Sequence, residues 1–147
     1  MSVPVNRRTH GKLEACSKAF ELAKYTLMIT KNKKIFTEEF QECLTDKIVE
    51  LAVEIFALTK EANDLSVRSS ADFKNYQDRI DMQRKAIQCC GKLSSYILLA
   101  KPSLHLSSKR VTYWTGMTKD TRTLIKAWME SDKKRFSTLF EDIKGVG

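Results

Sequence analysis

The sequence predicts an all-α protein folded as a single antiparallel, up-down four-helix bundle. Glycine (5) and proline (2) are scarce in 147 residues, which favours long regular elements over a fold rich in turns. Apolar residues recur every three or four positions in four segments, and no stretch alternates as a strand does. The predicted helices span about 10–31, 38–63, 70–101 and 108–131. We expect one domain over 1–147, with 1–9 and 132–147 flexible or extending the end helices.

The first and second helices are separated by a short lysine-rich stretch. Asn32 and the lysines beside it suit the end of the first helix. Its apolar stripe is Leu13, Cys16, Phe20, Ala23 and Leu27. Thr37 is a suitable N-cap for the second helix. Its core stripe falls within an arc of about 80° at 100° per residue and comprises Phe40, Leu44, Ile48, Leu51, Ile55, Leu58 and Ala62.

The third helix can be capped by Ser69 or Ser70, and Pro102 is expected to end it. Its steps of four and three form a seam typical of antiparallel bundles: Phe73, Tyr76, Ile80, Gln83, Ile87, Cys90, Ser94 and Ile97.

The stretch "KPSLHLSSKRVTYW" connects the third helix to the fourth. Leu104 and Leu106 can cover the end of the bundle, and Ser107 or Ser108 can begin the fourth helix. We expect His105 to have no ligand role. The apolar stripe that follows is Val111, Trp114, Met117, Thr121, Leu124 and Trp128.

Catalytic and metal-binding patterns are absent from the sequence. The residues three positions before the two histidines are Arg7 and Pro102, so the ExxH pattern of di-iron bundles is missing. No glycine-rich phosphate loop or nucleophile elbow occurs. The four cysteines lie in apolar-periodic segments without CxxC spacing, as in a reduced protein. The sequence therefore predicts no enzyme activity, no cofactor and no metal.

The charge is uneven along the chain, although the net value is +8. Residues 35–64 carry two basic and eight acidic groups, whereas residues 83–128 carry nine basic groups and one acid, Asp120. On the fourth helix, Lys119, Arg122, Lys126 and Lys133 fall within an arc of about 60°. The simplest alternative is a solvated face that aids solubility, but solubility is better served by interspersed charges of both signs than by charges of one sign. We therefore expect binding to nucleic acid or another polyanion.

The second helix has a second apolar face, opposite its core stripe, formed by Val49, Val53 and Phe56. In a four-helix bundle no helix is central, so a helix with two apolar faces indicates an interface. We expect these residues to seal an oligomer. The acidic stripe beside them, which we expect to meet basic helices of a neighbouring subunit, is Glu39, Asp46, Glu50, Glu54 and Glu61. The alternative is that Phe56 packs beneath a loop.

Two stretches, "KIVELAVEIFALTKEAND" and "YQDRIDMQRKAIQCCGKLSSYILLAKPSLHLSSKRVTYWTGMTKDTRTLIKAWMESD", resemble a known bacterial family. It is the four-helix-bundle family of the accessory variability determinant of diversity-generating retroelements, related to proteins encoded within intervening sequences of 23S rRNA genes. The resemblance covers about residues 13–131. It implies a homopentamer that binds the retroelement reverse transcriptase and its template RNA, or the cDNA made from it, and supports mutagenic cDNA synthesis without an active site.

The resemblance also implies which residues form the nucleic-acid face. By position these are Lys85, Lys92, Lys109, Arg110, Lys119, Arg122 and Lys126. The acidic second helix and the tail "KKRFSTLFEDIKGVG" are less expected in this family.

Two alternatives stay open. One is a protein–protein adaptor of the rRNA-intervening-sequence type with no RNA role, and the other is a metal-dependent bundle enzyme. The sequence has no apolar run long enough to span a membrane and no apolar segment behind its N-terminal charges, so we expect a cytoplasmic protein without a membrane partner.

Overall fold

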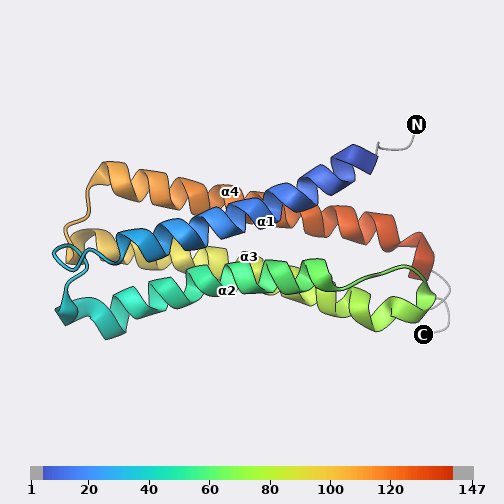
Figure 1. Ribbon diagram of the computed structural model, residues 1–147, viewed down its shortest axis with the longest axis horizontal. Helices are drawn as coiled ribbons and strands as arrows, with labels where there is room; N and C mark the ends of the chain where they lie inside the picture. The colour runs from blue at the N-terminus through green and yellow to red at the C-terminus, as the bar shows by residue number, and fades with distance from the viewer. Residues whose placement is uncertain (1–4, 141–147) are drawn as a thin grey trace.

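The computed structural model describes the backbone of residues 5–140, and side chains at residue 12 and residues 14–140. Four long helices, α1 (Val5–Ile29), α2 (Asp46–Asp64), α3 (Phe73–Ser103) and α4 (Ser108–Phe136), run alternately up and down (Figure 1). Each helix packs against the next, and α1 packs against α4 to close the bundle. The predicted four-helix bundle is therefore confirmed.

The ends of the predicted domain extend the end helices as far as the structure describes them. Residues 5–9 belong to α1, and residues 132–136 belong to α4, which is followed by a 3₁₀ turn at Thr138–Phe140. The remaining terminal residues, 1–4 and 141–147, lie outside the described residues.

The interior face of α1 differs from the predicted stripe. Ala23 is buried, but Phe20 is 52% exposed and Leu27 is 44% exposed, so the prediction was wrong for both. The buried residues of the helix are Ala15, Ala19, Leu22, Ala23, Thr26 and Ile29, and Thr30 directly after it is buried too. The threonines fit because each donates its hydroxyl to the carbonyl four residues earlier, Thr26 to Leu22 and Thr30 to Thr26, both at 2.8 Å.

The second helical segment starts as predicted but is not uniform. A 3₁₀ turn at Glu38–Phe40 and a π turn at Gln41–Thr45 precede α2. Thr37 occupies the N-cap position, yet its hydroxyl makes no capping bond to the described backbone. The π turn is tied by side chains, because Lys33 donates to Gln41 Oε1 and Gln41 Nε2 donates to Asp46, both at 2.7 Å. The core stripe of α2 is buried or partly buried as predicted.

The predicted serine caps are present at both later helices. Ser69 forms a capping box with Asp72 before α3, and the Ser107 hydroxyl accepts from the Arg110 backbone N–H at 3.1 Å at the start of α4. Pro102 lies inside the last turn of α3 rather than ending it.

The chain leaves α3 through a turn centred on His105. Its φ is +54°, the left-handed conformation that usually ends a helix with glycine. The Leu106 N–H reaches back to the Lys101 carbonyl at 2.9 Å, as in a Schellman turn. Leu104 and Leu106 are buried on either side, which confirms that they cover the end of the bundle.

That end of the bundle, which we call the apolar end, is closed by rings. Trp114 is fully buried, and its Nε1 donates to the Thr26 hydroxyl at 3.0 Å, which ties α4 to α1. Phe36, after α1, meets the Trp114 ring edge-on with centroids 6.1 Å apart. Aromatic contacts of this geometry add to the free energy gained by burying the rings.

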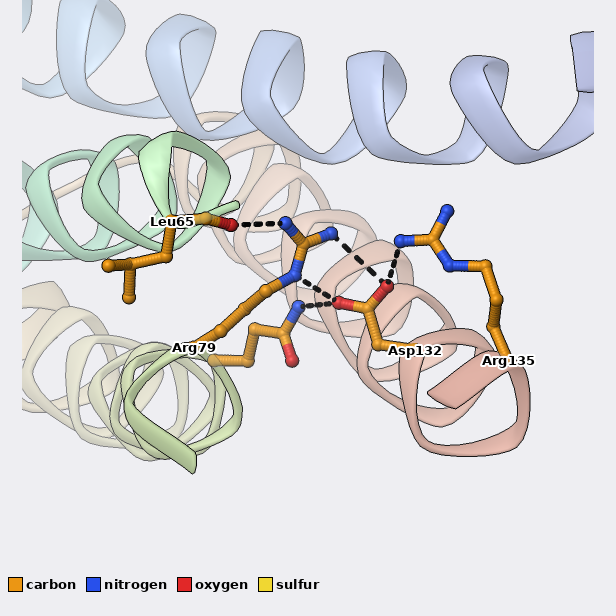
Figure 2. A network of polar contacts seen from close by, with 5 residues as sticks. Leu65, Arg79, Asp132 and Arg135 are labelled. Atoms are coloured by element: carbon orange, nitrogen blue, oxygen red, sulfur yellow. Dashed lines mark hydrogen bonds and ion pairs between the residues drawn. The ribbon is translucent and has the colours of Figure 1, made fainter. Parts of the chain in front are cut away.

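The opposite end, which we call the ionic end, contains a buried ion pair between α3 and α4 (Figure 2). Arg79 Nε donates to Asp132 at 2.7 Å, and the two side chains are 5% and 3% exposed. Arg79 also donates to the Leu65 carbonyl at 3.1 Å, and Asp132 accepts from Gln83 at 2.8 Å and from Arg135 at 3.2 Å. Because Leu65 follows α2, the network holds three parts of the chain together.

Candidate nucleic-acid interface

The seven predicted nucleic-acid-binding residues lie at the surface of the bundle. Six are exposed, and Arg110 is partly buried. Among the described residues, none of the seven forms an ion pair within 4.0 Å, in contrast to seven other basic residues: Lys18, Lys60, Lys74, Arg79, Arg84, Lys133 and Arg135. Unpaired cations can bind phosphate without first giving up a carboxylate partner.

The structure does not bring the seven residues onto one face. They form three groups: one on α4 beside α3, one on α3 that reaches the groove shared with α2, and one at the start of α4 beside α1. The first group, on α4, comprises Lys119, Arg122 and Lys126. Arg122 lies near Cys90 of α3, since its charge lowers the pKa of that thiol and partly offsets the rise caused by burial. This group is therefore on the side of α4 that is near α3. Its three residues lie on one arc of the helix, as predicted.

The second group lies on the outer side of α3. Lys85 and Lys92 are seven residues apart and therefore about 20° apart around the helix. Lys92 lines an open groove of about 710 Å³ between α2 and α3, together with Glu50, Glu54 and Tyr96. A polyanion that reaches Lys92 thus also approaches the acidic helix.

The third group, Lys109 and Arg110, occupies the first turn of α4, near α1. Here the sequence interpretation missed two tyrosines. Tyr113 is 57% exposed, and its ring meets Tyr25 of α1 edge-on with centroids 5.1 Å apart. Burial raises the pKa of the Tyr25 hydroxyl, and Arg110 opposes that shift through its charge and a hydrogen bond. The signal for Tyr113 was present in the sequence as an aromatic residue outside the apolar stripe of the fourth helix.

The predicted oligomer interface is larger than the three residues named from the sequence. Phe56 does not pack beneath a loop: its ring meets Phe20 of α1 edge-on at 5.7 Å. Leu27 and Val49 line one shallow groove between α1 and α2, and Val49 and Val53 line the groove between α2 and α3. We call the combined surface the outer apolar surface, and it comprises Phe20, Leu27, Val49, Val53 and Phe56.

Three of the cysteines lie in surroundings that disfavour the thiolate. Burial raises the pKa of Cys16, of Cys89 and of Cys90, the last to about 12. A thiol with a raised pKa is mostly protonated near neutral pH, whereas nucleophilic cysteines have lowered values. In the part of the chain that the structure describes, no three His, Cys, Asp or Glu side chains are grouped as a metal site would require. No described helix is long and apolar enough to cross a membrane.

Comparisons with known proteins return no relative: no protein-family model, no curated protein and no solved structure matches this chain.

Proposed function

We propose that this protein is a non-catalytic RNA-binding accessory subunit of a retroelement reverse transcriptase. It binds the polymerase and its template RNA and acts as a homo-oligomer, a pentamer by resemblance to the accessory family. The observation that carries the proposal is the set of seven surface cations that have no carboxylate partner among the residues the structure describes. The resemblance to the accessory family supports the polymerase as partner.

Counterion release makes this surface favourable for RNA. Each phosphate neutralised by a lysine or arginine frees a condensed cation, so the affinity falls steeply with salt. A binding titration of the purified protein against single-stranded RNA at several salt concentrations tests the proposal. We expect measurable binding at low salt and a negative slope of log affinity against log salt concentration. The absence of binding, or a flat slope, would contradict the proposed RNA-binding function.

A charge-reversal pair identifies the residues involved. The test variant is Lys119→Glu with Arg122→Glu and Lys126→Glu. The control carries the same change in net charge at ion-paired sites, Lys18→Glu with Lys60→Glu and Lys74→Glu. We expect the test variant to lose far more RNA affinity than the control and to lower the salt slope by about two to three, since each phosphate contact adds about 0.7–0.9. Equal losses would mean that only net charge matters.

Self-association is proposed through the outer apolar surface. Three of its members, Phe20, Leu27 and Val53, are large apolar side chains that a monomer would leave in water. Phe56→Glu should give a folded chain of lower mass by light scattering, because a carboxylate would have to be desolvated in the interface. An unchanged mass would show that the chain associates elsewhere or not at all.

The groove between α2 and α3 favours a second candidate function, a protein–protein adaptor. Its lining includes the apolar Leu51 and Val53, the carboxylates Glu50 and Glu54 and the lysines Lys47 and Lys92, so an amphipathic partner helix that carries both signs of charge would suit it. An adaptor of this kind predicts that Glu50→Lys combined with Glu54→Lys abolishes a partner complex, which the charge-reversed α4 variant keeps, because its three changed residues lie outside the groove.

A further inference from the structure

We propose that Tyr113 and Tyr25 form a stacking platform for unpaired bases, so that the RNA bound at the start of α4 is single-stranded. The inference rests on the proposed nucleic-acid function and names the class of ligand at one of its three surface groups. It concerns the group formed by Lys109 and Arg110.

The platform is anchored in the core by a continuous series of edge-on ring contacts. Phe36 meets Trp114 at 6.1 Å, Trp114 meets Tyr25 at 6.2 Å, and Tyr25 meets Tyr113 at 5.1 Å between centroids. Trp114 is held in turn by its hydrogen bond to Thr26. The outermost ring is therefore held on a rigid support, and a base that stacks on it does not have to order a mobile side chain.

The exposure of Tyr113 calls for an explanation beyond packing. An aromatic ring that serves only the core is mostly covered, whereas 57% of Tyr113 is in contact with water. The rings of Tyr25 and Tyr113 meet edge-on, with 68° between their planes, so each ring uses only one edge or one face in this contact. The remaining surface of the Tyr113 ring is available to a ligand.

The charges beside the platform suit a nucleic-acid strand. Arg110 interacts with the Tyr25 hydroxyl, and neither Lys109 nor Arg110 has an ion-pair partner among the described residues. Aromatic rings beside cations are the usual means by which proteins bind unpaired bases, with the cations on phosphates and the bases on ring faces. In a duplex the base faces are covered by their neighbours, so a platform of this kind distinguishes single strands from duplexes.

The platform can be tested independently of the other cations on α4. Tyr113 and Arg122 are nine residues apart, which places them about 180° apart around the helix. Replacing Tyr113 therefore leaves the group containing Arg122 intact. Tyr96, a partly buried tyrosine that lines the groove between α2 and α3, provides a tyrosine control away from the platform.

The experiment measures the affinity of a short uridine-rich RNA, single-stranded or paired with its complement, for four proteins: wild type, Tyr113→Ala, Tyr113→Phe and Tyr96→Ala. We expect Tyr113→Ala to weaken single-strand binding about tenfold and duplex binding less than twofold, with an unchanged salt slope because no phosphate contact is lost. Tyr113→Phe keeps the ring and should bind as wild type, and so should Tyr96→Ala.

The outcomes separate the two proposals. Wild-type protein that binds neither RNA overturns the proposed function and the platform with it. Wild-type binding that Tyr113→Ala leaves unchanged, or weakens equally for single strand and duplex, overturns the platform alone. Ultraviolet cross-linking of bromouridine-substituted RNA to the wild-type protein gives a second reading without any variant: adducts on Tyr113 or Tyr25 are expected, and adducts confined to other residues contradict the platform.

Discussion

At the apolar end of the bundle, α1 and α4 are joined by packed rings, by a buried neutral hydrogen bond from Trp114 to Thr26, and by Arg110 beside the partly buried Tyr25 hydroxyl. At the ionic end, α3 and α4 are joined by a buried charge pair, Arg79 and Asp132, with three further donors and acceptors around it. Removing atoms from packed rings or methyl groups lowers the free energy of unfolding by an amount that grows with the number of atoms removed. A buried ion pair behaves differently, because removing one partner leaves the other charged and without compensation. The two ends should therefore differ in how they respond to mutation.

The sharpest test of this difference is Asp132→Ala. We expect a loss of about 3–5 kcal/mol in the free energy of unfolding, because Arg79 would remain buried without its counter-charge. Urea unfolding monitored by circular dichroism measures the loss. Asp120→Ala, an exposed aspartate on the same helix, should change stability by less than about 0.5 kcal/mol.

A double replacement shows that the loss arises from the uncompensated charge. Arg79→Leu combined with Asp132→Leu should be more stable than Asp132→Ala alone, because no charge stays buried. A double variant as unstable as the single one would assign the loss to packing instead, and the two ends would then be alike.

At the apolar end the corresponding change is Thr26→Val, which keeps the shape and removes the hydroxyl. Trp114 Nε1 would lose its acceptor inside the core, and we expect a loss of about 1–3 kcal/mol. Thermal and urea unfolding provide the measurement, with Thr123→Val on the exposed side of α4 as the control. A larger loss here than for Asp132→Ala would reverse the comparison.

A smaller effect, of opposite sign, is expected at the turn that closes the apolar end. His105 holds a left-handed conformation that costs an L-residue free energy and glycine almost none. His105→Gly should therefore raise the free energy of unfolding by about 0.5–1 kcal/mol. His105→Ala keeps the backbone cost and should gain nothing; equal stability of the two variants would show that the turn is unstrained.

The smallest effects concern two tyrosine hydroxyls, one at each end. Burial raises the pKa of Tyr25 at the apolar end, and burial with the charge of Asp132 raises the pKa of Tyr76 at the ionic end. A raised folded-state pKa contributes stability that is fully present below the ordinary value of 10.0, and this contribution is lost as the pH rises from 10.0 through the higher folded-state pKa.

The charges near each tyrosine can be separated by variants. Asp132→Asn should lower the pKa of Tyr76 and leave that of Tyr25 unchanged. Arg110→Gln should raise the pKa of Tyr25 and leave that of Tyr76 unchanged. Nuclear magnetic resonance of ring-labelled tyrosine measures the pKa values of both hydroxyls. A variant in which the pKa values of Tyr25 and Tyr76 change together would mean that charges at one end influence the other.

The fold was largely predictable because the apolar periodicity of helices is a local property. The stripe from Leu44 to Ala62 identified the buried face of α2, and serine caps identified where α3 and α4 begin. The prediction was wrong for Phe20 and Leu27, because α1 buries Leu22 and Ile29 together with small residues and threonines and has further large apolar residues on its outer side. A helix with two apolar faces does not reveal which one is the interior.

The ionic end was missed because the partners are 53 residues apart. Asp132 nevertheless lies four residues after Trp128, in phase with the buried stripe of α4, and Arg79 lies between Tyr76 and Gln83 on the seam of α3. A charged residue in phase with a core stripe is the signal that could have identified it. The positions of the three groups of surface cations depend on how helices are rotated against one another, which periodicity within one helix does not specify.

The two tryptophans of this chain lie at opposite ends, Trp114 among rings and Trp128 beneath the Arg79 guanidinium, 5.2 Å from its ring centre. Each end therefore carries its own natural fluorophore in a distinct environment. Two single-tryptophan variants, Trp128→Phe and Trp114→Phe, each keep one of the two fluorophores. Their fluorescence during unfolding would show whether the bundle unfolds in one step or opens from one end first. Coincident transitions would indicate a single cooperative unit, and separate transitions would show which end of the bundle unfolds first.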